Sequence, residues 1–63
     1  MLYEHTERIN GIVYGIRDEK IYNVTEQERH GLNEDEPEIK YIVYKGKHFA
    51  DCLDELERIK NIL

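Results

Sequence analysis

Residues 39–44, Ile-Lys-Tyr-Ile-Val-Tyr, constrain the fold more than any other run, because they predict a β-strand that is apolar on both faces. Side chains alternate across a strand, so the run divides into two sets: Ile39, Tyr41 and Val43 on one face, and Ile42 and Tyr44 on the other. An antiparallel sheet normally keeps one face polar and in contact with water. A sheet that contains this strand therefore needs cover on two sides.

Two other runs rich in β-branched and aromatic residues, 9–16 and 21–24, predict two more strands. The polar residues 17–20 separate them, and a connection of this length is common in a hairpin. Gly11 and Gly15 interrupt the first run, where a glycine marks a bulge or the close approach of another group. The residues before this run favour no element, and we leave them unassigned.

The C-terminal residues predict an amphipathic helix, preceded by a turn at Gly46 and capped by Asp51. Its apolar residues recur at spacings of three and four and form one face: Phe49, Cys52, Leu53, Leu56, Ile59 and Leu63. Thr25 and Glu28 match a capping box, which predicts a single helical turn that ends at Gly31.

These elements predict an α+β fold with a three-stranded, mostly antiparallel sheet and one C-terminal helix packed on one face. Residues 1–63 make a single small domain, and a chain of this length buries only about 60% of its unfolded surface. Such small domains usually need additional stabilisation. Because Cys52 is the only cysteine, an internal disulfide is excluded and oligomerisation remains.

One helix covers one face of a sheet, so we expect the apolar residues on the second face to meet another chain. Tyr22, Ile42 and Tyr44 are the predicted partner-binding residues of this face, with Val13 beside them. The expected partners are a second copy of the chain, in a homodimer, and an unidentified protein. The alternative is that these apolar residues need no partner, because all proteins expose some single apolar groups.

Residues 26–38 hold six acids against one base, and their net charge of −5 equals the formal charge of the whole chain. This polar composition predicts a mobile acidic loop. Four of its acids are further predicted partner-binding residues, because they could occupy the basic groove of another protein: Glu34, Asp35, Glu36 and Glu38. The alternative is that the loop only keeps the domain soluble.

No pattern of residues predicts catalysis, a cofactor or a metal site, and we expect the protein not to be an enzyme. His48 and Cys52 stand four residues apart, but two ligands are too few for zinc. His5 and His30 lie far from them in the sequence. We expect Cys52 to be buried in the helix face as a small apolar residue.

A three-stranded sheet followed by one helix resembles the outline of phage integrase arm domains and of plant-type AP2 domains. In this chain the basic and aromatic residues Lys40, Tyr41, Tyr44, Lys45 and Lys47 stand at or near the last strand. The resemblance implies nucleic-acid binding as an alternative function, which the net charge of −5 opposes. A structural subunit of a larger assembly is a further alternative.

No apolar stretch approaches the roughly 20 residues of a membrane helix, and no signal peptide opens the chain, so we expect a cytoplasmic protein without a membrane partner. Eight isoleucines, five tyrosines and one alanine are typical of a gene rich in A and T. This composition suggests a low-GC bacterium or its phage. The prediction is thus a small acidic interaction module, encoded by such a phage, that binds and modulates or inhibits a protein.

Overall fold

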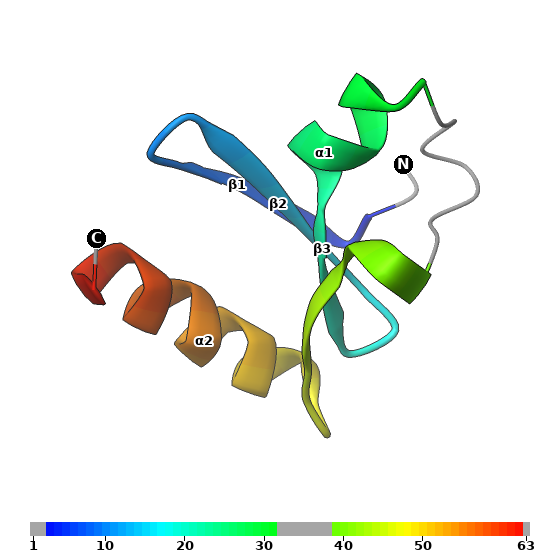
Figure 1. Ribbon diagram of the computed structural model, residues 1–63. Helices are drawn as coiled ribbons and strands as arrows, with labels where there is room; N and C mark the ends of the chain where they lie inside the picture. The colour runs from blue at the N-terminus through cyan, green and yellow to red at the C-terminus, as the bar shows by residue number, and fades with distance from the viewer. Residues whose placement is uncertain (1–2, 32–38, 63) are drawn as a thin grey trace.

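The computed structural model describes residues 3–31 and 39–62, which form an α+β fold. In chain order the elements are β1 (His5–Ile9), β2 (Ile12–Arg17), β3 (Lys20–Asn23), α1 (Val24–Arg29), the 3₁₀ turn η1 (Ile39–Tyr41), β4 (Ile42–Lys45) and α2 (Phe49–Ile62). The strands form one open antiparallel sheet in the order β1-β2-β3-β4. α1 and α2 lie on opposite sides of this sheet (Figure 1). Neither helix has the length and apolar character that crossing a membrane requires.

The predicted three-stranded sheet is wrong by one strand, because the first predicted strand contains a hairpin turn. Asn10 and Gly11 have φ angles of 50° and 82°, as a two-residue type I′ turn requires. Asn-Gly is the pair that most favours this turn, and it folds β1 back onto β2 with Ile9 opposite Ile12. The sequence therefore held the signal for the additional strand. The second hairpin, between β2 and β3, is confirmed.

β4 is shorter than predicted and contains an irregularity. η1 takes the place of the first half of the predicted strand. In the ladder with β3, Ile21 lies opposite Tyr44 and Tyr22 lies opposite Ile42, so that Val43 is an additional residue on β4. Such a bulge reverses the alternation of side chains. Ile42 and Tyr44 therefore lie on opposite faces of the sheet, whereas simple alternation had placed them on the same face.

Apolar side chains fill both faces of the sheet. The α2 core lies between the sheet and α2 and consists of Ile9, Tyr14, Ile16, Ile21, Cys52 and Leu56. The tyrosine core lies on the other face and consists of Tyr3, Tyr22, Val24 and Tyr41. As expected, α2 covers one face only, but the second face is not bare. Tyr3, the helix α1 and the turn η1 together cover part of it.

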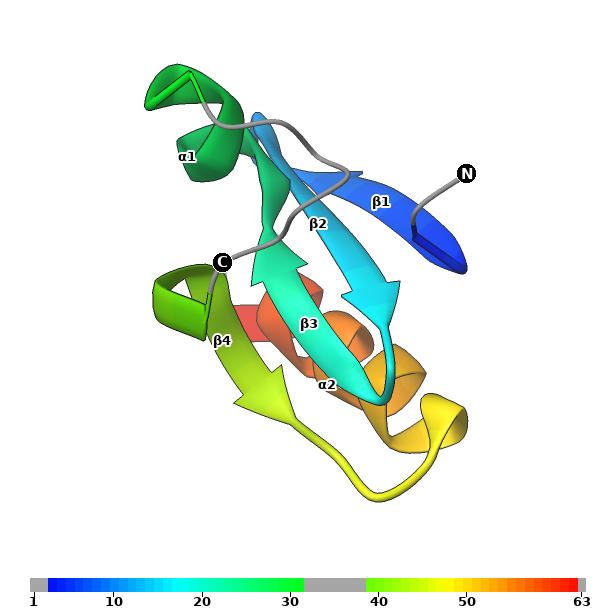
Figure 2. The ribbon, with the colours of Figure 1, turned by 90° about the vertical axis from the view of Figure 1, so that its right-hand side faces the viewer.

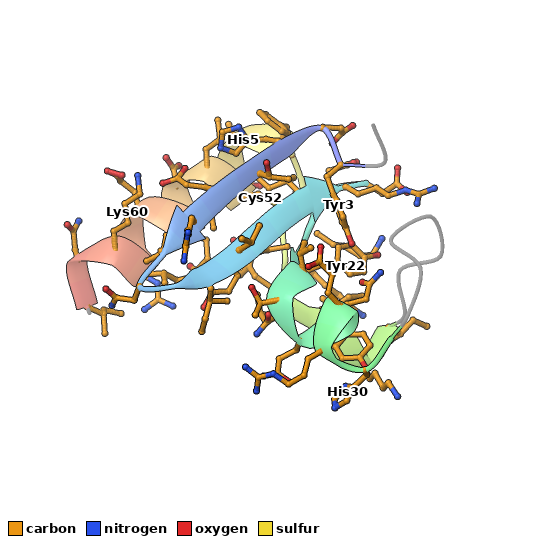
Figure 3. All side chains as sticks on the ribbon, turned by 90° about the horizontal axis from the view of Figure 1, so that it is seen from above. Tyr3, His5, Tyr22, His30, Cys52 and Lys60 are labelled. Atoms are coloured by element: carbon orange, nitrogen blue, oxygen red, sulfur yellow. The ribbon has the colours of Figure 1, made fainter. Side chains whose placement is uncertain are left out.

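Gly15 makes this second cover possible. The Tyr3 ring lies so close to it that a Cβ atom at position 15 would be 2.7 Å from ring carbons. This contact confirms the close approach predicted for Gly15. The Tyr3 ring also lies against Tyr22, with ring centroids 5.9 Å apart, and its hydroxyl donates a hydrogen bond to Oε1 of the fully buried Gln27. Figure 3 shows Tyr3 and Tyr22 next to each other beside α1.

The predicted cap of α1 is wrong by two residues. Asn23 is the N-cap, and its Oδ1 accepts a hydrogen bond from the Glu26 amide at 3.0 Å. Thr25 lies inside the helix, and its Oγ1 accepts a hydrogen bond from the Val13 amide at 2.8 Å. Thr25 therefore joins α1 to β2. Residues 26–29 of the predicted acidic loop lie in α1, and residues 32–38 are outside the described residues.

α2 begins at Phe49, two residues before the predicted cap. The predicted N-cap is therefore wrong, because Asp51 is the third residue of the helix. Its Oδ2 accepts hydrogen bonds from the Lys47 and His48 amides at 2.9 Å each, as the third helical residue of a capping box does. These two backbone donors lower the pKa of the Asp51 carboxyl group. The predicted apolar face of α2 is confirmed at Cys52 and Leu56, which are fully buried against the sheet.

Candidate interaction surface

The predicted partner-binding residues do not form one exposed patch. Tyr22 is 7% exposed in the tyrosine core, and Ile42 is half-buried beside it. Tyr44 is half-buried against the α2 core, on the opposite face. The predicted acids of the loop, Glu34, Asp35, Glu36 and Glu38, lie outside the described residues. Partner binding by any of these residues stays a prediction.

The bulge at Val43 is the reason for this separation. Sequence alternation joins positions 42 and 44, but it does not show where a partner strand will accommodate an additional residue. The two edges of the sheet are the other surfaces on which a partner could bind. β1 and β4 are these edges, and Figure 2 shows them on opposite sides of the sheet.

Two polar side chains of the β1 edge, His5 and Glu7, are already bound within the protein, and Arg8 on the same strand is exposed. Nε2 of His5 lies 3.3 Å from Oε1 of Glu7, and Glu7 also forms an ion pair with Lys60 of α2. The hydrogen bonds from Lys60 and His5 lower the pKa of Glu7. The His5 ring also packs edge-on against Phe49, with centroids 6.4 Å apart. Charged side chains are a common protection of edge strands against pairing with another chain.

The β4 edge is apolar. Three of its four residues are Ile42, Val43 and Tyr44, and it contains no acid. Val43 is 48% exposed, and Ile39 in the adjoining turn η1 is 80% exposed. No strand in the described chain lies on the outer side of β4. This edge carries the exposed Lys45 and the bulge at Val43, and it lacks the ion pairs to another element that β1 has.

The backbone of β4 can accept another strand. The Gly46 amide donates to the Glu19 carbonyl at 2.8 Å, so Gly46 and Glu19 form a hydrogen-bonded pair of the ladder. Such pairs alternate with pairs that are not hydrogen-bonded, and the next pair, Lys45 with Lys20, is of the second kind. The amide and carbonyl of Lys45 therefore point away from β3, toward the outer side of the sheet.

A basic row crosses one end of the sheet. We use this name for Arg17, Lys20 and Lys45, which lie opposite one another on β2, β3 and β4. Residues directly opposite share a face, and this face is the one that carries the tyrosine core. Arg17 has a carboxylate nearby, Asp18, at 3.6 Å, whereas neither Lys20 nor Lys45 has an ion pair with a described residue. Like charges in opposite positions destabilise a sheet.

The other face beside β4 is acidic, and two of its acids, Asp51 and Glu55, have partners. Burial raises the pKa of Tyr44, and the charges of Asp51 and Glu55 raise it further. Asp51 is occupied by the two amides at the start of α2. Glu55 accepts a hydrogen bond from Nε of Arg58 at 2.9 Å. The face with the basic row thus holds Lys45, which has no ion pair with a described residue, and Lys20, which donates a hydrogen bond to the Asp18 carbonyl at 3.3 Å. The other face holds the Tyr44 ring beside the bound acids Asp51 and Glu55.

Cys52 is the single cysteine of the sequence, and its side chain is fully buried. Burial raises the pKa of its thiol and so disfavours the reactive thiolate. The prediction that Cys52 packs as a small apolar residue is confirmed. The part of the chain that the structure describes forms no pocket and contains no group of three side chains that could hold a metal ion.

Comparisons with known proteins found no family model, no curated protein and no solved structure that matches this chain. Function is therefore inferred from the edge of β4 and its surroundings.

Proposed function

We propose that the protein is a small, non-enzymatic interaction module that binds an extended segment of another chain along the outer side of β4. The contrast between the two edges of the sheet carries this proposal. On β1, His5 and Glu7 are bound within the protein, whereas β4 offers Val43 and the outward backbone groups of Lys45.

Strand addition suits a chain of this size. Main-chain hydrogen bonds supply the affinity, and alternate side chains supply the specificity, so that no preformed pocket is needed. An added strand would pair with the outward amide and carbonyl of Lys45. It would also cover Val43 and Ile39, which are the apolar residues exposed at this edge.

The homodimer predicted from the sequence is one form that this binding could take. A second copy offers Ile42, Val43 and Tyr44 on β4 but no acid, so its β4 supplies no carboxylate opposite Lys45. A different chain that carries acids is therefore the better partner. The homodimer, a partner with a basic groove and modulation of the partner's activity stay predictions.

Two variants at one position test strand addition. Lys45→Gln removes only the charge, whereas Lys45→Pro also removes the outward amide, and an edge strand tolerates proline where its amide faces solvent. Peptides selected from a random display library on the wild-type protein provide the ligands. We expect Lys45→Gln to retain binding and Lys45→Pro to abolish it, with both variants folded by circular dichroism.

Amide chemical shifts of the wild-type protein with a selected peptide should change along β4. Selected peptides that bind Lys45→Pro as tightly as Lys45→Gln, or that change only amides distant from β4, would contradict the proposal.

A further inference from the structure

The faces on either side of β4 define which segment fits it best. Resting on the proposed function, we infer that the partner of β4 is an extended polypeptide segment in which acidic residues alternate with apolar ones. The acidic side chains would face the basic row, and the apolar side chains would face Tyr44.

The basic row determines the acidic positions. A residue of an added strand that lies opposite Lys45 shares the face of Lys45, Lys20 and Arg17. Opposite residues of neighbouring strands have Cβ atoms about 4.5–5.5 Å apart, so a carboxylate there reaches the Lys45 ammonium. Because Lys20 and Lys45 have no ion pair with a described residue, this carboxylate would also relieve the repulsion between them.

Tyr44 determines the apolar positions. Side chains next to the acidic ones point to the α2 face, where the half-buried Tyr44 ring adjoins the α2 core. Two of the acids near this ring, Asp51 and Glu55, are bound by amides and by Arg58, and a third, Asp54, also acts on the ring. These acids would repel an acidic side chain at these positions. An apolar side chain of the added strand at these positions would pack against Tyr44 and enlarge the α2 core.

The same features favour a polypeptide over a nucleic acid. A phosphate backbone would satisfy the basic row, but it offers neither the main-chain partners for Lys45 nor apolar side chains for Tyr44 and Val43. An acidic partner also fits this edge better than a second copy does, because β4 itself contains no acid that could pair with Lys45.

Three short blocked peptides test the inference: glutamate alternating with valine, lysine alternating with valine, and serine alternating with valine. Binding is measured by amide shift titration at low salt. Exposed ion pairs are individually weak, so we expect the glutamate peptide to bind about tenfold tighter than the lysine peptide, with the serine peptide between them. The preference should shrink at about 0.5 M salt, because salt screens exposed charges.

Lys45→Glu should reverse the order of the glutamate and lysine peptides. Arg8→Glu is the matched control, because it changes the net charge equally from an exposed position on the opposite edge. It should leave the order unchanged. If Arg8→Glu changes the order as much as Lys45→Glu does, the preference reflects net charge and the inference is wrong.

Other outcomes separate the inference from the proposed function. Equal binding of the three peptides along β4 would overturn the acidic preference and leave strand addition intact. Shifts away from β4 with every peptide would overturn both. A thymidine oligonucleotide that binds the basic row more tightly than the glutamate peptide, or sedimentation that shows a dimer lost in Lys45→Pro, would overturn the acidic polypeptide as the partner.

Discussion

The two faces of the sheet are covered in different ways. The α2 face is covered by one helix of 14 residues, which contributes Cys52 and Leu56 to a core that also contains three isoleucines and Tyr14. The other face is covered in part by tyrosines whose hydroxyls bind polar groups, and the basic row occupies the rest of it. The first face provides most of the buried aliphatic surface. The second face, with its incomplete cover, leaves the flank of β4 open to a partner.

Leu56→Ala should produce the largest effect, because it removes a fully buried side chain of the α2 core. We expect it to lower the free energy of unfolding by about 2–5 kcal/mol, measured by chemical denaturation. Leu53→Ala, on the same helix but 38% exposed, is the control and should cost less than about 1 kcal/mol. Equal losses in the two variants would contradict the assignment of the α2 core.

Gly15→Ala tests the tyrosine core. Its Cβ would lie 2.7 Å from the Tyr3 ring, so the ring must move, and we expect a loss of about 1–3 kcal/mol by chemical denaturation. The same change in a Tyr3→Ala background should cost much less, because the clash is then absent. A loss that is independent of residue 3 would mean that Tyr3 does not cover this face.

Asn23→Ala should cost about 1 kcal/mol, since it removes the cap of the helix that covers the tyrosine core. Asn23→Asp keeps the accepting oxygen and is the matched control. Thermal unfolding of both variants measures the difference. If Asn23→Ala and Asn23→Asp unfold together, another group caps α1.

Lowering the pH should weaken the contact between β1 and α2. This is the smallest of the four effects on stability that we expect. Lys60 and His5 lower the folded-state pKa of Glu7 below its ordinary value of 4.5, so the ionised form is bound more strongly in the folded state. The resulting stability is present above pH 4.5 and is lost as the pH falls through the lowered pKa. Glu7→Gln should remove this part of the acid dependence in denaturation curves recorded across that range. An unchanged profile would show that the Glu7 ion pair contributes nothing.

Local patterns predicted the elements whose signals lie within a few residues. The spacing of Cys52 and Leu56 was sufficient for α2, and the polar residues between two β-branched runs were sufficient for the hairpin of β2 and β3. The Asn10-Gly11 turn was equally local, but we interpreted its glycine as an interruption inside a strand. The cap at Asn23 was also visible, and the capping-box pattern at Thr25 competed with it.

The candidate site could not be predicted in this way, because it depends on contacts between distant parts of the chain. The bulge at Val43 exists only in the register with β3, and this register separates Tyr44 from Tyr22 and Ile42. The cover of the second face requires Tyr3 to meet Gly15. The apolar character of β4 was evident from the sequence, whereas its position at an edge follows from the order of four strands.

Hydrogen exchange at Lys45 tests the central claim most directly. In the protein alone, the outward Lys45 amide should exchange rapidly, whereas the Gly46 amide, bound to Glu19, should be protected. Saturation with the glutamate–valine peptide should slow exchange at Lys45 to a rate similar to that of Gly46. Rapid exchange at Lys45 in the saturated complex would contradict strand addition to β4.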